Sequence, residues 1–359
     1  MLFFISEEIA QQAANGDDEI INSLYSLGYF WRTGYCLIDA SRASLQKLAD
    51  IDKLKGDYEL VLQQKQSVLG LYKEIDFFVV LSTDDNPRAG RIIDGAEGRV
   101  ISINHFKNRI KYGLSLVLCE NIRDYDLYKW GAQYFSNIDD DVFKIQTLGY
   151  NGGGAVIVES AKHIADLPCL AICDNDKKYP EDDEGQTLTD FRNYYLSERP
   201  LLTWMYEIKV HEIENLIPHN LLCMAYSTKG LVKKMKGVKT NPHYGLFFSF
   251  FDFKEGFKRC TLRKMRNENV ASYNSYLSFL RSIGVPQSKI DTTLASSYKK
   301  NESSLLSGLS GELLRYVVEF VYSHNLTTPV VLDDHQKDDW KNITRKMWSI
   351  GCANNPRRV

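Results

Sequence analysis

The sequence lacks the patterns that would place it in a membrane or in an oxidising compartment. None of its apolar runs is long enough to cross a bilayer. The opening MLFFISEEIAQQ has too short an apolar run for a signal peptide and no basic flank before it. The seven cysteines are odd in number and scattered, which does not suit a disulfide framework. We therefore expect a cytoplasmic protein without a membrane partner.

Several catalytic signatures are missing as well. The sequence has no Gly-x4-Gly-Lys-Ser/Thr phosphate loop, no Gly-x-Ser-x-Gly elbow, and no cysteine and histidine set with zinc-site spacing. The first absence excludes ATP binding in the usual phosphate cradle. The net charge is only −2, so any surface that binds nucleic acid must be a local patch.

The composition, 44% hydrophobic and 25% charged, is that of an ordinary globular protein. A length of 359 residues exceeds what a single core usually supports. The patterns predict three domains: an N-terminal α/β unit of unknown role at 1–103, a central α/β domain at 104–220, and a mainly helical region at 221–359.

The N-terminal unit is predicted to alternate strands and helices. Apolar runs indicate strands at 2–6, 34–41 and 75–87. Three aspartates lie near the strand ends, namely Asp39, Asp76 and Asp84. They can form a metal site in principle, but surface or turn roles explain them more simply.

In the central domain, acidic residues follow buried strands. LSLVLCE (114–120) and LPCLAICDND (167–176) carry acids only at their carboxyl ends, as expected of strands buried on both faces of a parallel sheet. Ligands bind at that edge of an open α/β sheet. Glu120 ends the first strand, and Asp124 opens the next helix. Alternation along the second strand would place Asp174 and Asp176 on the same side.

Four converging carboxylates repel one another unless a cation neutralises them or their pKa values rise. Oxygen ligands favour Mg²⁺ or Mn²⁺, and two such ions about 4 Å apart can activate water and stabilise the leaving oxygen of a phosphodiester. For any single acid a loop or helix-capping role is more common, and Asp124 suits capping. The order of all four acids between buried strands favours the metal site.

These residues resemble the motifs of a Toprim domain. The resemblance rests on Glu120 and Asp124, the Gly152-Gly153-Gly154 turn, Asp174 and Asp176, and the HEIEN segment (211–215). It covers about 105–220, and the most similar variety is the overcoming-lysogenization-defect type of nuclease, with the stand-alone Toprim-like proteins of bacterial anti-phage systems. One departure is Asn121, where family members commonly have glycine. The resemblance implies a small parallel sheet flanked by helices.

The resemblance further implies a Mg²⁺- or Mn²⁺-dependent nuclease, acting as the toxic effector of an anti-phage system. Glu120, Asp124, Asp174 and Asp176 would hold metal and serve catalysis. Lys177 would assist as the basic residue, with Lys178 and Lys209 as further candidates. Glu212 and Glu214 would complete the metal shell, unless the HEIEN segment is structural and Asn215 caps the following helix. By analogy, we expect a separate ATPase partner and consider a homo-oligomer.

A basic and aromatic segment occupies 228–266. It contains eleven Lys or Arg residues against two acids, interleaved with phenylalanines. Such a segment can bind a phosphate backbone and stack bases, and the candidate cations are Lys233, Lys234, Lys236, Lys258 and Arg259. The run FFSFFDF (247–253) is more simply a core element. The substrate implied is DNA or RNA, including tRNA.

A second interpretation keeps the fold and drops the catalysis. The Asn151-Gly152-Gly153-Gly154 turn opens a helix, and its amides can face an anion. Strand-to-helix turns also use glycine for conformational reasons alone. On this interpretation the protein is a non-catalytic module that binds a nucleotide or a partner protein at the glycine-rich edge.

Overall fold

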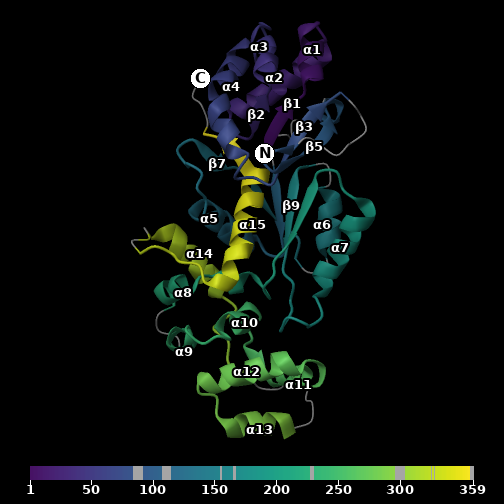
Figure 1. The fold of residues 1–359 in the computed structure, drawn as a ribbon. Coiled ribbons are helices and arrows are strands. Elements are labelled where there is room, and N and C mark those ends of the chain that lie inside the picture. Colours follow the sequence, from purple (N-terminus) through teal and green to yellow (C-terminus); the bar gives the residue numbers. More distant parts are fainter. Residues whose placement is uncertain are drawn as a thin grey trace. The chain divides into compact units, whose positions relative to one another are not determined.

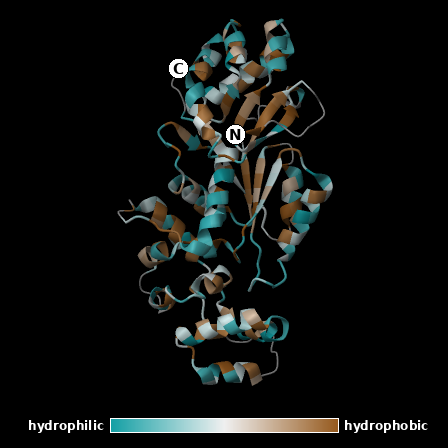
Figure 2. Ribbon diagram, viewed as in Figure 1, coloured by the Kyte–Doolittle hydropathy of each residue, from teal (hydrophilic) through white to brown (hydrophobic). Residues whose placement is uncertain are grey.

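Apolar strands and amphipathic helices alternate along the chain, as Figure 1 traces from the N-terminus to the C-terminus. The structure is a computed structural model, and it describes residues 1–83, 92–106, 115–153, 156–164, 167–226, 230–295, 304–324, 326 and 328–355. The strands in Figure 2 are coloured mainly brown to white, whereas the helices mix teal with brown. Within the described ranges, no helix is long and apolar enough to span a membrane.

The chain divides into two units of structure. The first comprises 1–171, 197–205 and 341–359, and the second comprises 172–196 and 206–340. These limits do not coincide with the predicted boundaries at 103 and 220, because a C-terminal strand returns to the first unit. There β13 (Cys352–Asn354) pairs antiparallel with β7 (Phe143–Ile145).

Sheet A of the first unit has the strand order β2-β1-β3-β5-β4. Strand β1 pairs parallel with β2 and with the central strand β3, β3 pairs parallel with β5, and the edge strand β4 is antiparallel to β5. The strands are β1 (Leu2–Ile5), β2 (Leu37–Ala40), β3 (Phe77–Ser82), β4 (Ile92–Ile93) and β5 (Ala96–Ser102). The three strands predicted in this region are present, because their apolar runs are long enough to be buried on both faces.

The helices of this region begin where side chains can cap them. The side chains of Ser6, Asp17 and Ser41 accept hydrogen bonds from the first turns of α1, α2 and α3. The elements are α1 (Glu7–Ala14), α2 (Asp18–Arg32), α3 (Arg42–Ala49), α4 (Lys55–Leu71) and the 3-10 helix η1 (Ile103–Phe106).

The aspartates near the strand ends have local partners. Asp39 is buried and accepts hydrogen bonds from Lys65 Nζ (2.8 Å) and Tyr72 Oη (3.1 Å). Asp76 forms ion pairs with Arg345 and Lys346. These two aspartates therefore stabilise the fold of the first unit, and Asp84 lies outside the described residues.

Sheet B has the strand order β10-β9-β6-β8, and β6 pairs parallel with both β8 and β9. Its strands are β6 (Leu116–Cys119), β8 (Leu148–Asn151), β9 (Cys169–Cys173) and β10 (Thr203–Glu207). The helices that follow these strands in the sequence are α5 (Ile122–Tyr134), α6 (Ile157–His163) and α7 (Gln186–Glu198). The prediction of an α/β protein with a parallel sheet is confirmed at this level. The division into units falls within β9, α7, β10 and the long helix α15 (Asp334–Gly351).

The rest of the second unit is mainly helical where the structure describes it. Its elements are η3 (Ile213–Leu216), α8 (His219–Ala225), α9 (Gly230–Val238), α10 (Tyr244–Ser249), β11 (Phe257–Lys258), α11 (Arg259–Glu268), α12 (Val270–Ser282), α13 (Gln287–Ala295), β12 (Ser304–Leu306) and α14 (Leu313–Ser323). Phe247 lies in the aromatic core of the second unit, where its ring stacks on those of Phe251 and Phe279. The interpretation of the FFSFFDF run as a core element is confirmed.

Candidate metal centre

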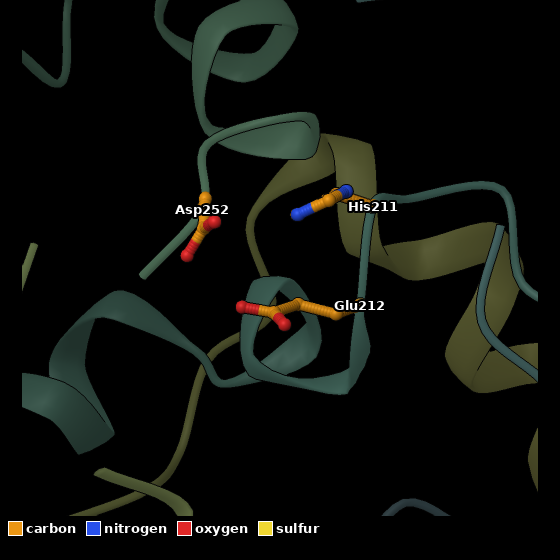
Figure 3. A group of neighbouring side chains, drawn as sticks. All are labelled: His211, Glu212 and Asp252. Atoms are coloured by element: carbon orange, nitrogen blue, oxygen red, sulfur yellow. The ribbon is translucent and has the colours of Figure 1, made fainter. Parts of the chain in front are cut away.

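A histidine and two acids converge in the second unit. His211 and Glu212 directly precede η3, and Asp252 lies in the loop after α10. One ligand atom from each residue lies within 4.8 Å of the other two. Figure 3 shows the imidazole ring and the two carboxylates turned toward one another. Nitrogen and carboxylate oxygen are ligand types that divalent transition metals accept.

Backbone hydrogen bonds hold the two segments of this cluster together. The N–H of His211 donates to the carbonyl of Ser249 (2.7 Å). The side-chain amide of Asn215 donates to the carbonyls of Phe248 (2.6 Å) and Phe251 (2.8 Å). Asp252 is therefore fixed next to the HEIEN segment, although helices α8 to α10 separate the two in sequence.

Asn215 has a second role within the HEIEN segment. Its side-chain oxygen accepts the N–H of Glu212 (3.0 Å), which closes a capping box on η3. The helix that follows, α8, has Pro218 at its N-cap position. The prediction that Asn215 caps the following helix is therefore wrong, because its amide serves η3 and the loop that carries Asp252.

A single lysine contacts two buried glutamates, one of which, Glu212, belongs to this cluster. Lys254 Nζ lies 2.9 Å from Glu212 Oε2 and 3.2 Å from Glu214 Oε1. The glutamate side chains are 9% and 2% exposed, whereas the Lys254 side chain is 43% exposed. Lys254 thus reaches from solvent onto two buried carboxylates.

The electrostatics of the cluster follow from its burial. Burial raises the pKa of Glu212 to about 7 against the opposing charge of Lys254. Burial, together with the charge of Glu212, raises the pKa of Glu214 to about 7. Burial also lowers the pKa of His211. For Lys254, burial lowers the pKa but the two carboxylates outweigh it, so the pKa is raised.

Three buried atoms of the cluster have no hydrogen-bond partner among the residues that the structure describes. They are His211 Nδ1, Glu212 Oε1 and Glu214 Oε2. Buried polar atoms in folded proteins are almost always paired, and an unpaired one costs about 1–3 kcal/mol. An unsatisfied imidazole nitrogen and an unsatisfied carboxylate oxygen, on two residues of the cluster of His211, Glu212 and Asp252, are the pattern that a bound cation would complete.

The charge and size of the cluster suit a divalent ion. Burial favours the protonated forms of Glu212 and Glu214, and a bound cation would displace those protons. Three ionised carboxylates (Glu212, Glu214 and Asp252) against one ammonium (Lys254) would then give a formal charge of −3 + 1 = −2. Ligands on opposite sides of an ion, each about 2.1 Å from it, are about 4.2 Å apart. The ligand atoms of the cluster, which all lie within 4.8 Å of one another, are therefore close to the spacing that one ion needs.

Two of the predicted metal ligands, Glu120 and Asp124, belong to the first unit. Glu120 follows β6 and is half-buried. Asp124 is buried, and its Oδ2 accepts the N–H of Asn121 (2.8 Å) in a capping box at the start of α5. The N-cap residue of α5 is thus Asn121, and Asp124 takes part in the capping from the first turn of the helix.

Asp174 and Asp176 belong to the second unit. The strand β9 ends at Cys173, and Asp176 is exposed with a left-handed φ of 59°, whereas Asp174 is buried. Strand alternation does not apply beyond Cys173, so the prediction that the two aspartates share one side of a strand is wrong. The four-carboxylate site is divided between the two units and stays a prediction.

Asp176 nevertheless lies beside the histidine cluster. Its N–H donates to the carbonyl of His211 (2.9 Å). Asp176 also lines a cavity of about 700 Å³, whose other charged residues are the cations Lys178, Arg263 and Lys264 and the acids Asp182, Asp183 and Glu184. That volume is within the usual range for small-ligand pockets. The Nζ of Lys177, the residue predicted to assist catalysis as the basic group, lies 3.7 Å from Glu184 Oε1.

The glycine-rich turn uses its amides internally. Gly152 N–H donates to the carbonyl of Cys119 (2.7 Å), and Gly153 N–H donates to Asn151 Oδ1 (3.0 Å). A Cβ on Gly152 would approach Leu118 Cδ1 to 2.6 Å, so packing requires glycine there. Gly154 lies outside the described residues. These contacts favour the conformational interpretation of the turn over anion binding.

The basic segment divides into two groups of cations. Lys233, Lys234 and Lys236 are exposed on α9. Lys258 pairs with Glu255, and Arg259 is half-buried with its Nε enclosed. Of the five candidate cations, the three on α9 are therefore the ones most available to a phosphate backbone.

Sequence reasoning missed His211, Asp252 and Lys254 as members of a site. One signal was present: Asp252 is one of only two acids in the basic segment 228–266. An acid inside a basic, aromatic segment indicates a specific role for that residue.

Comparisons with known proteins give this chain no relatives: no family model, no curated protein and no solved structure matches it.

Proposed function

We propose that this protein is a nuclease that depends on a divalent metal held by His211, Glu212 and Asp252. The supporting observation is the convergence of these three side chains in a buried cluster that contains unpartnered imidazole and carboxylate atoms. A structural ion-pair network would leave fewer such atoms. The net charge of the cluster and its neighbouring lysine also matches a divalent ion.

The donor set narrows the expected metal. The donor set is mixed: carboxylate oxygens suit manganese and magnesium, imidazole nitrogen suits zinc, and magnesium in particular prefers oxygen ligands and water. We therefore propose Mn²⁺ as the activating ion, with Zn²⁺ as a competitor and Mg²⁺ as a weaker substitute. Such an ion supplies a bound water of lowered pKa and a positive charge for developing oxyanions.

The proposed reaction is hydrolysis of a phosphodiester. The oxygen of a water attacks phosphorus, the bond from phosphorus to the leaving oxygen breaks, and the proton of the water ends on the leaving oxygen. The exposed lysines of α9 support a polyanionic substrate, because they lie in the same unit as the centre. The cavity beside Asp176 supplies room next to the centre for part of that substrate.

The resemblance in sequence extends this proposal. We assign sheet B and its helices to a Toprim-like domain, and the protein to the toxic effectors of anti-phage systems in the cytoplasm. A separate ATPase subunit and self-association are further parts of the proposal. The substrate class is DNA or RNA, with tRNA included.

The test is to measure metal binding and cleavage on one preparation. Calorimetry with Mn²⁺, and incubation with DNA, RNA and tRNA in Mn²⁺, should show binding and cleavage by the wild type. Asp252→Asn should lose both. Glu255→Gln is the matched control, because Glu255 is exposed in the same loop and pairs with Lys258.

The outcomes separate the two interpretations of the chain. Absence of binding of Mn²⁺, Zn²⁺ and Mg²⁺ would overturn the proposed centre. Binding that Asp252→Asn removes, without cleavage of any nucleic acid even when a cognate ATPase is added, would favour the non-catalytic module.

A further inference from the structure

The ammonium of Lys254 lies between the carboxylates of Glu212 and Glu214, at 2.9 Å and 3.2 Å. Each glutamate therefore gives one oxygen to Lys254. The other oxygen of each, Glu212 Oε1 and Glu214 Oε2, is buried and has no hydrogen-bond partner among the described residues. Both carboxylates are more than nine-tenths buried, so their remaining oxygens are enclosed rather than hydrated.

Glu212 belongs to two groups at once. With His211 and Asp252 it forms the cluster whose ligand atoms lie within 4.8 Å of one another. With Glu214 it holds the ammonium of Lys254. In two-metal phosphodiesterases, a shared carboxylate commonly bridges two cations about 4 Å apart. Here one of the two cation positions beside Glu212 is occupied by a side chain of the protein itself.

We propose that Lys254 is a built-in second cation: the centre takes one divalent ion, at His211, Glu212 and Asp252, and the ammonium of Lys254 fills the second cation position. This inference rests on the proposed function. It departs from the pair of metal ions that the four-carboxylate prediction requires. It also replaces Lys177 with Lys254 as the basic residue that faces the substrate, because the Lys254 side chain is exposed at the solvent side of the centre.

The position of Lys254 is set by the same aspartate that completes the metal cluster. Asp252 Oδ1 accepts the N–H of Lys254 (2.9 Å) and the N–H of Glu255 (2.6 Å). This turn holds the backbone of Lys254 two residues from Asp252. The divalent ion and the ammonium would therefore be placed by one loop, and their spacing would be fixed by a tight turn.

The test counts metal ions in the full chain by calorimetric titration with Mn²⁺. The wild type should bind one ion, and Lys254→Gln should bind two, because Glu212 and Glu214 then form a second site with no cation in it. Lys254→Arg should bind one ion, since the charge is retained. Lys258→Gln, which removes a lysine from the same loop outside the cluster, is the matched control and should also bind one.

Two results would overturn the inference without touching the proposed function: two ions in the wild type, or one ion in Lys254→Gln. No ion in the wild type would instead defeat the proposed function. If Lys254→Gln does not fold, the electron paramagnetic resonance spectrum of wild type saturated with Mn²⁺ decides. An isolated Mn²⁺ signal supports the built-in cation, and a coupled pair of ions excludes it.

Discussion

The buried acids of the two units differ in how fully they are compensated. In the first unit, Asp39 is 1% exposed, and its two oxygens meet Lys65 and Tyr72. Lys65 also donates to the carbonyl of Ala40, so the whole group is satisfied within the protein. Such an acid contributes to the stability of the fold, and it has no unpaired oxygen with which to bind a ligand.

Two buried acids of the second unit are under-compensated. Glu212 and Glu214 share the single ammonium of Lys254 and retain an unpaired oxygen each. The two regions have similar burial and differ in the number of partners. The comparison teaches that unsatisfied hydrogen-bonding capacity, more than burial or acidity, distinguishes a candidate site from a structural ion pair.

The largest expected effect comes from removing the lysine of each group. Lys65→Met should destabilise the protein by about 3 kcal/mol, because Asp39 is left buried without a cation. Lys254→Met should cost less when Mn²⁺ is present, since an ion can replace the ammonium. Urea unfolding with and without Mn²⁺ measures both. If both variants lost the same free energy of unfolding, and Mn²⁺ did not change the losses, the proposed difference between the two groups would be wrong.

Metal affinity should separate the two groups of acids next. Glu212→Gln is expected to weaken Mn²⁺ binding by about 100-fold, because it removes a ligand charge from the cluster. Asp39→Asn should leave the affinity unchanged, although it also neutralises a buried carboxylate. Calorimetry on both variants gives the comparison. A similar loss in Asp39→Asn would show that metal binding depends on general stability rather than on the cluster.

Nucleic-acid binding should distinguish the lysines of the two units. Replacing Lys233, Lys234 and Lys236 with alanine is expected to weaken binding about tenfold and to reduce the slope of log affinity against log salt by about 2 to 3. The control is the alanine triple at Lys47, Lys53 and Lys55, which are exposed in the first unit. Filter binding over a salt series measures the slopes, and equal slopes for the two triples would remove α9 from the interface.

The smallest expected effect concerns Asp124. Asp124→Ala should cost about 1 kcal/mol of stability, because a capping hydrogen bond of α5 is lost. Binding of Mn²⁺ should not change if the centre is the cluster in the second unit. Thermal unfolding and calorimetry measure the two quantities. Loss of metal binding in this variant would restore the four-carboxylate site.

The parts of the fold that could be predicted are those encoded by local pattern. The strands β1, β3, β6 and β9 can be recognised in the sequence, because a strand that is buried on both faces appears there as a continuous apolar run. The cap at Asp124 was also legible, because a capping residue acts within one helical turn.

The metal cluster could not be predicted in the same way. His211 and Asp252 are brought together by bonds from Asn215 and from the His211 backbone to carbonyls of the α10 region. Backbone carbonyls are present at every position, so nothing in the pattern of side chains marks these contacts. The left-handed backbone of Asp176 could not be predicted either, because side chains alternate only within a strand and Asp176 lies beyond the end of β9.

The return of β13 to the first unit has a consequence for biosynthesis. The amino group of Met1 donates to the carbonyl of Cys352 (2.7 Å), and β13 supplies the pairing partner of β7. A nascent chain therefore cannot complete its N-terminal unit until residues 352–354 have left the ribosome. Until then, the buried start of β1 lacks a partner that lies 351 residues further along the chain, and the edge of β7 lacks one about 210 residues further along. Both are exposed in the incomplete chain, where a chaperone could protect them from aggregation.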